Sequence, residues 1–221
     1  MRAAWLCLVL APATLPPARA AGPEPVVVRV FAYAPAPTGA AESGEEIFRR
    51  AGVPTRWKEC TPARGDCEPL LDGEILLKVV RRPWINGPAR SSFGAAVLDR
   101  HSYLGWVFEE HIEEVARANE ISSRIVVAYV MAHEVAHLLG LKHSEKGIMH
   151  CEFSDAEIRS ADTGALKFTS EEMLELQAAA AARRHATIAS LLPFRRNLSP
   201  AAEYQHHVER RPFRAPPTGS R

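Results

Sequence analysis

The sequence has few cysteines, few aromatic residues and almost no net charge. Its 221 residues include four cysteines and 7% aromatic residues, and 27 Lys and Arg stand against 26 Asp and Glu. So few cysteines exclude a disulfide-dense scaffold, and the near-neutral balance gives no overall attraction to nucleic acid or to an anionic membrane. We therefore expect no nucleic-acid partner, and the function has to be inferred from a local site.

The chain also lacks an apolar run long enough to span a membrane. The apolar stretch at 3–11 follows Arg2 and precedes Ala18-Arg19-Ala20, which is the layout of a secretory signal peptide with cleavage after Ala20. A membrane-spanning helix needs about 20 apolar residues, so a permanent anchor is the weaker interpretation. We expect residues 1–20 to be removed and the mature protein to be secreted or periplasmic.

Removal of Cys7 with the signal peptide leaves Cys60, Cys67 and Cys151. In an oxidising compartment Cys60 and Cys67 can close a small loop, which leaves Cys151 unpaired. The loop contains Arg64-Gly65-Asp66, and we interpret this triplet as a turn rather than an adhesion motif.

The first half of the mature chain alternates short apolar segments with polar breaks. Such segments predict strands at 26–31, 55–59, 75–80, 93–98 and 103–108. Residues 35–41 are rich in Pro, Ala and Gly and predict a loop. A short helix is expected at 45–51, because Gly52 and Pro54 follow it.

The second half is predicted to be helical. One helix is expected after residue 108, where apolar residues recur at helical spacing. Ser122 or Ser123 can cap the next helix, which ends near Gly140. The upstream part of this helix is apolar on every face, so we expect it to be buried in the protein core.

A last helix begins at Thr169. Thr169 and Glu172 match a capping box, and Phe168 with Met173 matches a hydrophobic staple. The helix continues through an alanine run toward residue 192. Residues 193–221 are rich in arginine and proline without apolar periodicity, which predicts a disordered basic tail.

The segment 133–143 carries the chemistry. On a helix, His133 and His137 lie on one face and can present imidazole nitrogens to one cation. Glu134 is rotated by about 100° from His133, so its carboxylate lies beside the metal and suits a general base. Gly140 can end the helix and let the chain turn, so that His143 supplies a third nitrogen. Three neutral histidines leave one coordination position open, which is typical of a catalytic zinc site.

This stretch resembles the zinc signature of the metzincin metallopeptidases, H-E-x-x-H-x-x-G-x-x-H, and Met149 resembles the methionine of their Met-turn. Ser144 is similar to the matrixins, whereas Ile148-Met149-His150 is similar to the astacins. Cys151 stands where astacins carry a tyrosine, so both subfamilies remain open. The resemblance implies an α+β fold for residues 21–192: a mixed twisted sheet, a buried active-site helix and a C-terminal helix.

The resemblance further implies a secreted zinc-dependent endopeptidase acting on a protein or peptide substrate. His133, His137 and His143 would hold Zn²⁺, and Glu134 would act as general base. Met149 would form an apolar floor beneath the histidines. An edge strand at 93–98 would hold an extended peptide by strand addition. Nothing in the sequence specifies an oligomeric state.

Two other functions fit the same residues. One is a catalytically weak, zinc-holding binding or inhibitory module, suggested by the small size and by the lack of room for a propeptide between Ala20 and Val26. The other is a regulator-cleaving zinc protease of the cytosolic type, which the predicted signal peptide opposes. A zinc-blocking thiolate from Cys60 or Cys67 is an alternative to their disulfide.

The remaining candidates are weaker. We expect His150, next to Met149, to face solvent or to support the site, with substrate contact as the alternative. His101 and His111 lack ligand spacing and are predicted to be structural or surface residues. Phe153 is expected either to line a substrate pocket or to belong to the core. His206-His207 lie in the predicted tail and could bind metals loosely.

Overall fold

A computed structural model describes residues 25–33, 38–61, 73–83, 92–97 and 103–185. Within these ranges the chain forms five strands and five helices. They are β1 (Val26–Ala32), α1 (Ala40–Arg50), β2 (Thr55–Cys60), β3 (Ile75–Val80), β4 (Gly94–Ala96), β5 (Leu104–Phe108), α2 (Glu109–Ala118), α3 (Ser123–Leu138), α4 (Asp155–Asp162) and α5 (Ser170–His185).

Several sequence predictions fall outside the described residues. They concern the signal peptide at 1–20, the tail at 193–221, the Arg64-Gly65-Asp66 triplet, Cys67, His101 and His206-His207. In the part of the chain that is described, no helix is long and apolar enough to cross a membrane.

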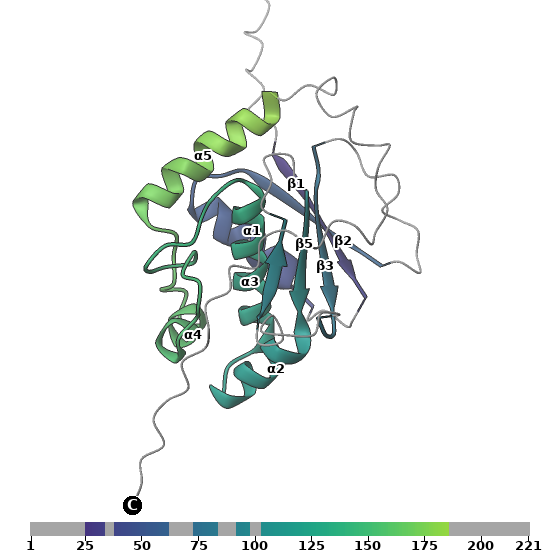
Figure 1. Cartoon of the computed structure of the whole chain (residues 1–221), viewed down its shortest axis with the longest axis vertical. Coiled ribbons are helices and arrows are strands. Elements are labelled where there is room, and N and C mark those ends of the chain that lie inside the picture. Colours follow the sequence, from purple (N-terminus) through teal and green to yellow (C-terminus); the bar gives the residue numbers. More distant parts are fainter. Residues whose placement is uncertain (1–24, 34–37, 62–72, 84–91, 98–102, 186–221) are drawn as a thin grey trace, which may run out of the picture.

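The strands form one mixed sheet in the order β2-β1-β3-β5-β4 (Figure 1). β1 pairs in parallel with β2 and β3, and β3 pairs in parallel with β5. β4 runs antiparallel to β5 and lies at the edge of this sheet. The expected α+β class with a mixed sheet is thus confirmed, and the strand expected at 93–98 is an edge strand, although it is only three residues long.

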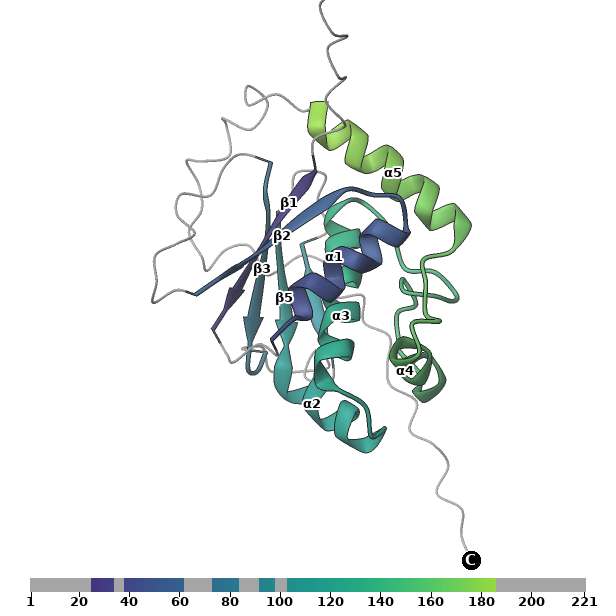
Figure 2. The same ribbon diagram turned by 180° about the vertical axis from the view of Figure 1, so that it is seen from behind.

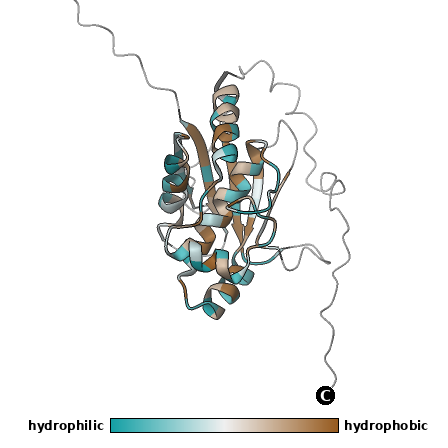
Figure 3. Ribbon diagram, turned by 90° about the vertical axis from the view of Figure 1, so that its left-hand side faces the viewer, coloured by the Kyte–Doolittle hydropathy of each residue, from teal (hydrophilic) through white to brown (hydrophobic). Residues whose placement is uncertain are grey.

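Helices α1 and α3 pack side by side against the sheet (Figure 2). The inner strands β1 and β3 are hydrophobic along most of their length, whereas the outer helices carry both hydrophobic and hydrophilic residues (Figure 3). Val28 and Leu77 from the strands and Met131 from α3 are fully buried in one core. Each such side chain stabilises the fold by about 1.5–3 kcal/mol through removal of apolar surface from water.

α3 is the most deeply buried helix of those described. Every residue from Val126 to Leu138 is buried, as its all-round apolar sequence predicts. Ser122 occupies the N-cap position, but its side chain makes no capping hydrogen bond. The side chains at the end of α3 are therefore held by a rigid, tightly packed element.

One prediction about the helices was wrong, and one helix was missed. α1 begins at Ala40 rather than at 45, because Ala40 and Ala41 are buried against the core and Gly39, with a φ of 84°, starts the helix. Helix α4 was not predicted, although Ser154 and Glu157 form a capping box at its start. Both helices are short, and their apolar faces are too small to give a strong periodic signal.

The start of α5 agrees with prediction. The N–H of Thr169 donates to Oε2 of Glu172 over 2.7 Å, and the N–H of Glu172 donates to Oγ1 of Thr169 over 3.2 Å. These reciprocal bonds confirm the capping box. The described part of the helix ends at His185.

Candidate metal centre

Three histidine side chains converge at the end of α3. His133 and His137 lie one turn apart, and Nε2 of His137 lies 2.9 Å from Nε2 of His133 and 3.1 Å from Nε2 of His143. The candidate ligand atoms of the three residues all lie within 4.8 Å of one another. The structure thus brings together the three residues that the sequence spacing predicts as metal ligands.

Main-chain carbonyl groups fix the orientation of two of these rings. Nδ1 of His133 lies 2.7 Å from the carbonyl oxygen of Ile148, and Nδ1 of His137 lies 2.8 Å from that of Leu141. A carbonyl oxygen can only accept, so each Nδ1 carries the proton and each Nε2 presents a lone pair. The two Nε2 atoms therefore cannot hydrogen-bond to each other. Their facing lone pairs are instead suited to binding one shared cation.

Burial keeps these histidines neutral. His133 and His137 are 9% and 7% exposed, and burial lowers the pKa of His133 to about 3 and that of His137 to about 4. Burial also lowers the pKa of His143, which is more exposed. Neutral imidazole is the form that binds metals, and three imidazoles leave one position of a tetrahedral zinc ion open. The group therefore suits Zn²⁺.

The chain beyond α3 turns as the sequence predicts. Gly140 has a φ of 102° and its N–H donates to the carbonyl of His137 over 2.8 Å, which ends the helix. This left-handed conformation favours glycine. The turn brings His143 back to the two histidines on the helix.

A second turn, from Ser144 to Met149, holds one of the histidines in place. The N–H of Ser144 donates to the carbonyl of Met149 over 2.9 Å, and Ile148 and Met149 are both fully buried. The carbonyl of Ile148 is the group that holds His133. Met149 thus belongs to the turn that orients a candidate ligand, and its role as an apolar floor stays a prediction.

Glu134 is not part of the three-histidine group, and its carboxyl group faces the edge strand. It is 5% exposed, and burial raises the pKa of its carboxyl group to about 8. A Cβ built on Gly94 of β4 would lie 2.5 Å from Oε1 of Glu134. The carboxyl group is therefore packed against the main chain of β4, and its role as general base stays a prediction.

Aromatic rings extend from the metal centre toward α2. The ring of Phe153 meets that of His133 edge-on at 5.8 Å, and it stacks on Phe93 at 6.3 Å. Phe93 in turn stacks on His111 at 4.8 Å. We call Phe153, Phe93 and His111 the aromatic wall. Both expectations for Phe153 are compatible with its position. His111 is partly exposed and stacked on Phe93, which agrees with a structural or surface residue. Phe93 was missed because its contacts are distant in sequence.

His150 is held by α4. Its Nδ1 lies 2.8 Å from Oε1 and 2.9 Å from Oε2 of Glu157. His150 also forms an isolated bridge with Ser144, the residue after His143. His150 is thus linked both to α4 and to the residue next to His143, and the expectation that it faces solvent or supports the site stays a prediction. Glu157 was missed, although the Ser154-x-x-Glu157 capping signal could have located it.

The described cysteines agree with part of the prediction. Cys60 is disulfide-bonded, while its expected partner Cys67 lies outside the described residues. Cys151 is free and exposed. A zinc-blocking thiolate from Cys60 is excluded by its disulfide.

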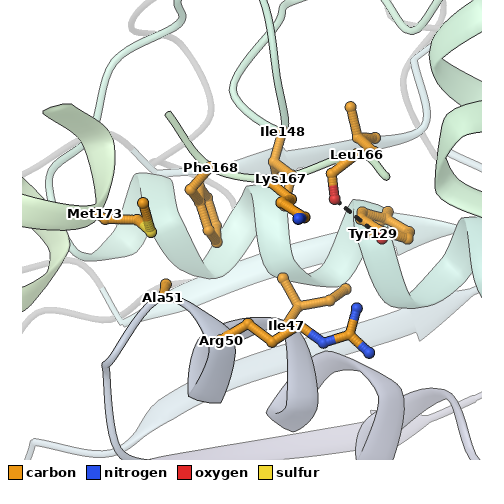
Figure 4. A pocket seen from close by; sticks show the side chains of 9 residues that line it. All are labelled: Ile47, Arg50, Ala51, Tyr129, Ile148, Leu166, Lys167, Phe168 and Met173. Atoms are coloured by element: carbon orange, nitrogen blue, oxygen red, sulfur yellow. Dashed lines mark hydrogen bonds between the residues drawn. The ribbon is translucent and has the colours of Figure 1, made fainter. Parts of the chain in front are cut away.

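A cavity lies between α1, α3 and the start of α5, and Ile148 of the second turn forms part of its lining (Figure 4). Its volume is about 40 Å³, and its lining includes Tyr129, Ile148 and Phe168 but none of the three histidines. The hydroxyl of Tyr129 donates to the carbonyl of Leu166 over 3.1 Å at its wall. A cavity of this size holds a few water molecules and no peptide side chain of substantial size, so it is not the candidate active site.

Comparison with solved structures gives distant likenesses, two of which are to zinc peptidases. A zinc-dependent peptidase from Methanocorpusculum labreanum is 14% identical with a TM-score of 0.48, and covers 67% of this chain and 99% of its own. An archaemetzincin from Methanopyrus kandleri is 15% identical with a TM-score of 0.49, and covers 70% of this chain and 95% of its own. No model of a protein family and no curated protein matches the sequence.

Proposed function

We propose that this protein is an exported zinc-dependent endopeptidase of the metzincin type. The observation that carries the proposal is that the Nε2 atoms of His133 and His137 lie 2.9 Å apart with both lone pairs free to bind a cation. The Nδ1 atom of each ring donates to a main-chain carbonyl group and so fixes this orientation. His143 adds a third nitrogen at 3.1 Å from that of His137. These three residues would hold the zinc ion and leave room for a substrate at a fourth position.

Glu134 is the residue that would move protons. When bound, zinc supplies Lewis-acid chemistry, which polarises a substrate carbonyl and lowers the pKa of water from about 15.7 toward about 7. The Glu134 carboxylate would accept a proton from the attacking water and deliver it to the nitrogen of the leaving amine. Its position beside the helix face that carries His133 and His137 suits this task, because it is adjacent to the ligands without being one of them.

Strand β4 would bind the substrate. It lies at the edge of the described sheet and pairs on one side with β5, with Ala95 opposite Trp106. An extended peptide can add to such an edge through main-chain hydrogen bonds, which are independent of peptide sequence. β4 packs against α3, so a peptide on this edge would pass close to Glu134. The aromatic wall, which includes Phe93 and Phe153, would then offer an apolar surface to a substrate side chain.

Export is a separate part of the proposal. It rests on the signal-peptide layout of residues 1–20, and the disulfide bond at Cys60 is consistent with an oxidising compartment. Sequencing the N-terminus of the protein recovered from the exported fraction tests it. A mature chain beginning at Ala21 is expected, and a chain found only inside the cell with Met1 intact would contradict export.

The catalytic proposal is tested by metal content and peptide hydrolysis. The wild type should bind one zinc ion per chain and cleave members of a broad peptide library. Glu134→Gln should retain zinc while losing at least about 100-fold in kcat, since general-base catalysis contributes about 10²–10⁴-fold. His111→Gln, which changes a histidine outside the three-histidine group, is the matched control for zinc content. A wild type that binds no zinc, or a Glu134→Gln variant with full activity, would refute the mechanism.

A further inference from the structure

Strand β4 touches the carboxyl group of Glu134 through a glycine. A Cβ on Gly94 would lie 2.5 Å from Oε1 and 2.9 Å from Cδ of Glu134. Such separations are well inside van der Waals contact, so only a residue without a side chain allows the strand to come this close. The main chain of β4 therefore forms one wall of the space that Glu134 occupies.

Neither partner of this contact can easily retreat. Glu134 is 5% exposed and belongs to the buried part of α3. Gly94 is paired with Val107 of β5, and the carbonyl of the preceding Phe93 accepts from the N–H of Phe108 over 2.8 Å. The same added Cβ would also lie 2.8 Å from the carbonyl oxygen of Trp106. A side chain at position 94 would therefore displace the carboxyl group, the strand, or both.

We propose that Gly94 is the positioning residue for Glu134. Because Gly94 has no side chain, the main chain of the peptide-binding edge can contact the carboxyl group of Glu134 directly. This contact fixes the position of the carboxyl group relative to a peptide bound on β4. This inference rests on the proposed function of Glu134 and β4. It assigns a role to a residue that contributes no functional group of its own.

The contact itself is tested without activity, in the metal-free protein. Gly94→Ala should lower the temperature of unfolding of the wild type. In a Glu134→Ala background, where the carboxyl group is gone, the decrease caused by Gly94→Ala should be smaller by at least about 2 °C. Ala95→Ser adds one heavy atom on the opposite face of the same strand, and its effect should be equal in both backgrounds. Equal losses for Gly94→Ala in both backgrounds would place the clash at Trp106 and overturn the inference.

A failure to fold is also informative. If Gly94→Ala does not fold but Gly94→Ala with Glu134→Ala does, the carboxyl group is the obstacle and the inference is supported. If neither folds, the clash does not depend on Glu134, and the inference is overturned.

The functional consequence is tested on the zinc-loaded protein. Gly94→Ala should bind zinc within about threefold of the wild type, because the three atoms nearest the added methyl group belong to Glu134 and Trp106, while kcat falls by about 100-fold from misplacement of the carboxylate. In a Glu134→Gln background, where no carboxylate remains to be misplaced, Gly94→Ala should lower the residual kcat by less than about threefold. Full kcat in Gly94→Ala, or an equal loss of kcat in the Glu134→Gln background, would overturn the positioning role. A wild type that cleaves no peptide would instead refute the proposed function, while the unfolding cycle still decides the contact.

Discussion

Zinc is expected to stabilise this protein against unfolding through the three-histidine group. Two ligands lie on the buried helix α3, and the ring of His133 is held by the carbonyl of Ile148 from the second turn. The unfolded chain has no such arrangement, so zinc binds the folded state preferentially. At a free zinc concentration 100-fold above the dissociation constant, binding adds about 2.7 kcal/mol to the free energy of unfolding. For a domain of this size this corresponds to a rise of about 5–11 °C in the unfolding temperature.

The assay compares thermal unfolding with added zinc and after removal of metal by a chelator. His137→Gln removes the central nitrogen, which lies 2.9 Å from that of His133 and 3.1 Å from that of His143, and should abolish the zinc-dependent rise. His111→Gln lies outside this group and should keep it. An equal unfolding temperature with zinc and with chelator in the wild type would refute the reasoning, as would a full rise in His137→Gln.

Three further predictions concern the turns around the site. Burial raises the pKa of the Glu157 carboxyl group, but hydrogen bonds from His150 and Ser154 outweigh it and hold the pKa below its ordinary value. Since the stability given by a depressed pKa is lost as the pH falls through that pKa, Glu157→Gln should cost about 1 kcal/mol near pH 7 and much less near pH 3 in denaturant titrations; an equal cost at both would contradict the pairing. Met149 is fully buried, so Met149→Ala should cost about 2–5 kcal/mol in unfolding free energy and Met149→Leu less than about 1.5 kcal/mol; equal costs would show that its volume does not matter. Gly147 has a φ of 81° and its added Cβ would lie 2.7 Å from a main-chain oxygen, whereas Gly73 has a φ of 87° and no atom of the described residues within 4 Å; Gly147→Ala should therefore destabilise by at least about 1 kcal/mol more than Gly73→Ala.

The metal centre was predictable because its main information is local. The spacing of His133, His137 and His143 and the turn at Gly140 involve neighbours in sequence, and the serine cap and all-round apolar sequence located the buried helix. The edge strand could be placed for the same reason, although its length could not.

The surroundings of the centre could not be predicted, because they depend on contacts between distant segments. Nothing in the sequence near Phe93 indicates that its ring stacks on Phe153, and nothing near Gly94 indicates a contact with Glu134. The link between His150 and Glu157 needed helix α4, whose capping signal is present but short. Tertiary packing, and not local preference, determines these pairs.

The burial of α3 couples the metal centre to the stability of the hydrophobic core. The helix that supplies two candidate zinc ligands is also a central part of the hydrophobic core. Any opening of the core that moves this helix away from the second turn must also separate His133 from the carbonyl group of Ile148 that orients its ring. Metal binding and the folded structure would therefore be lost in a single cooperative event, and under the proposed function a partly unfolded copy would keep no peptidase activity.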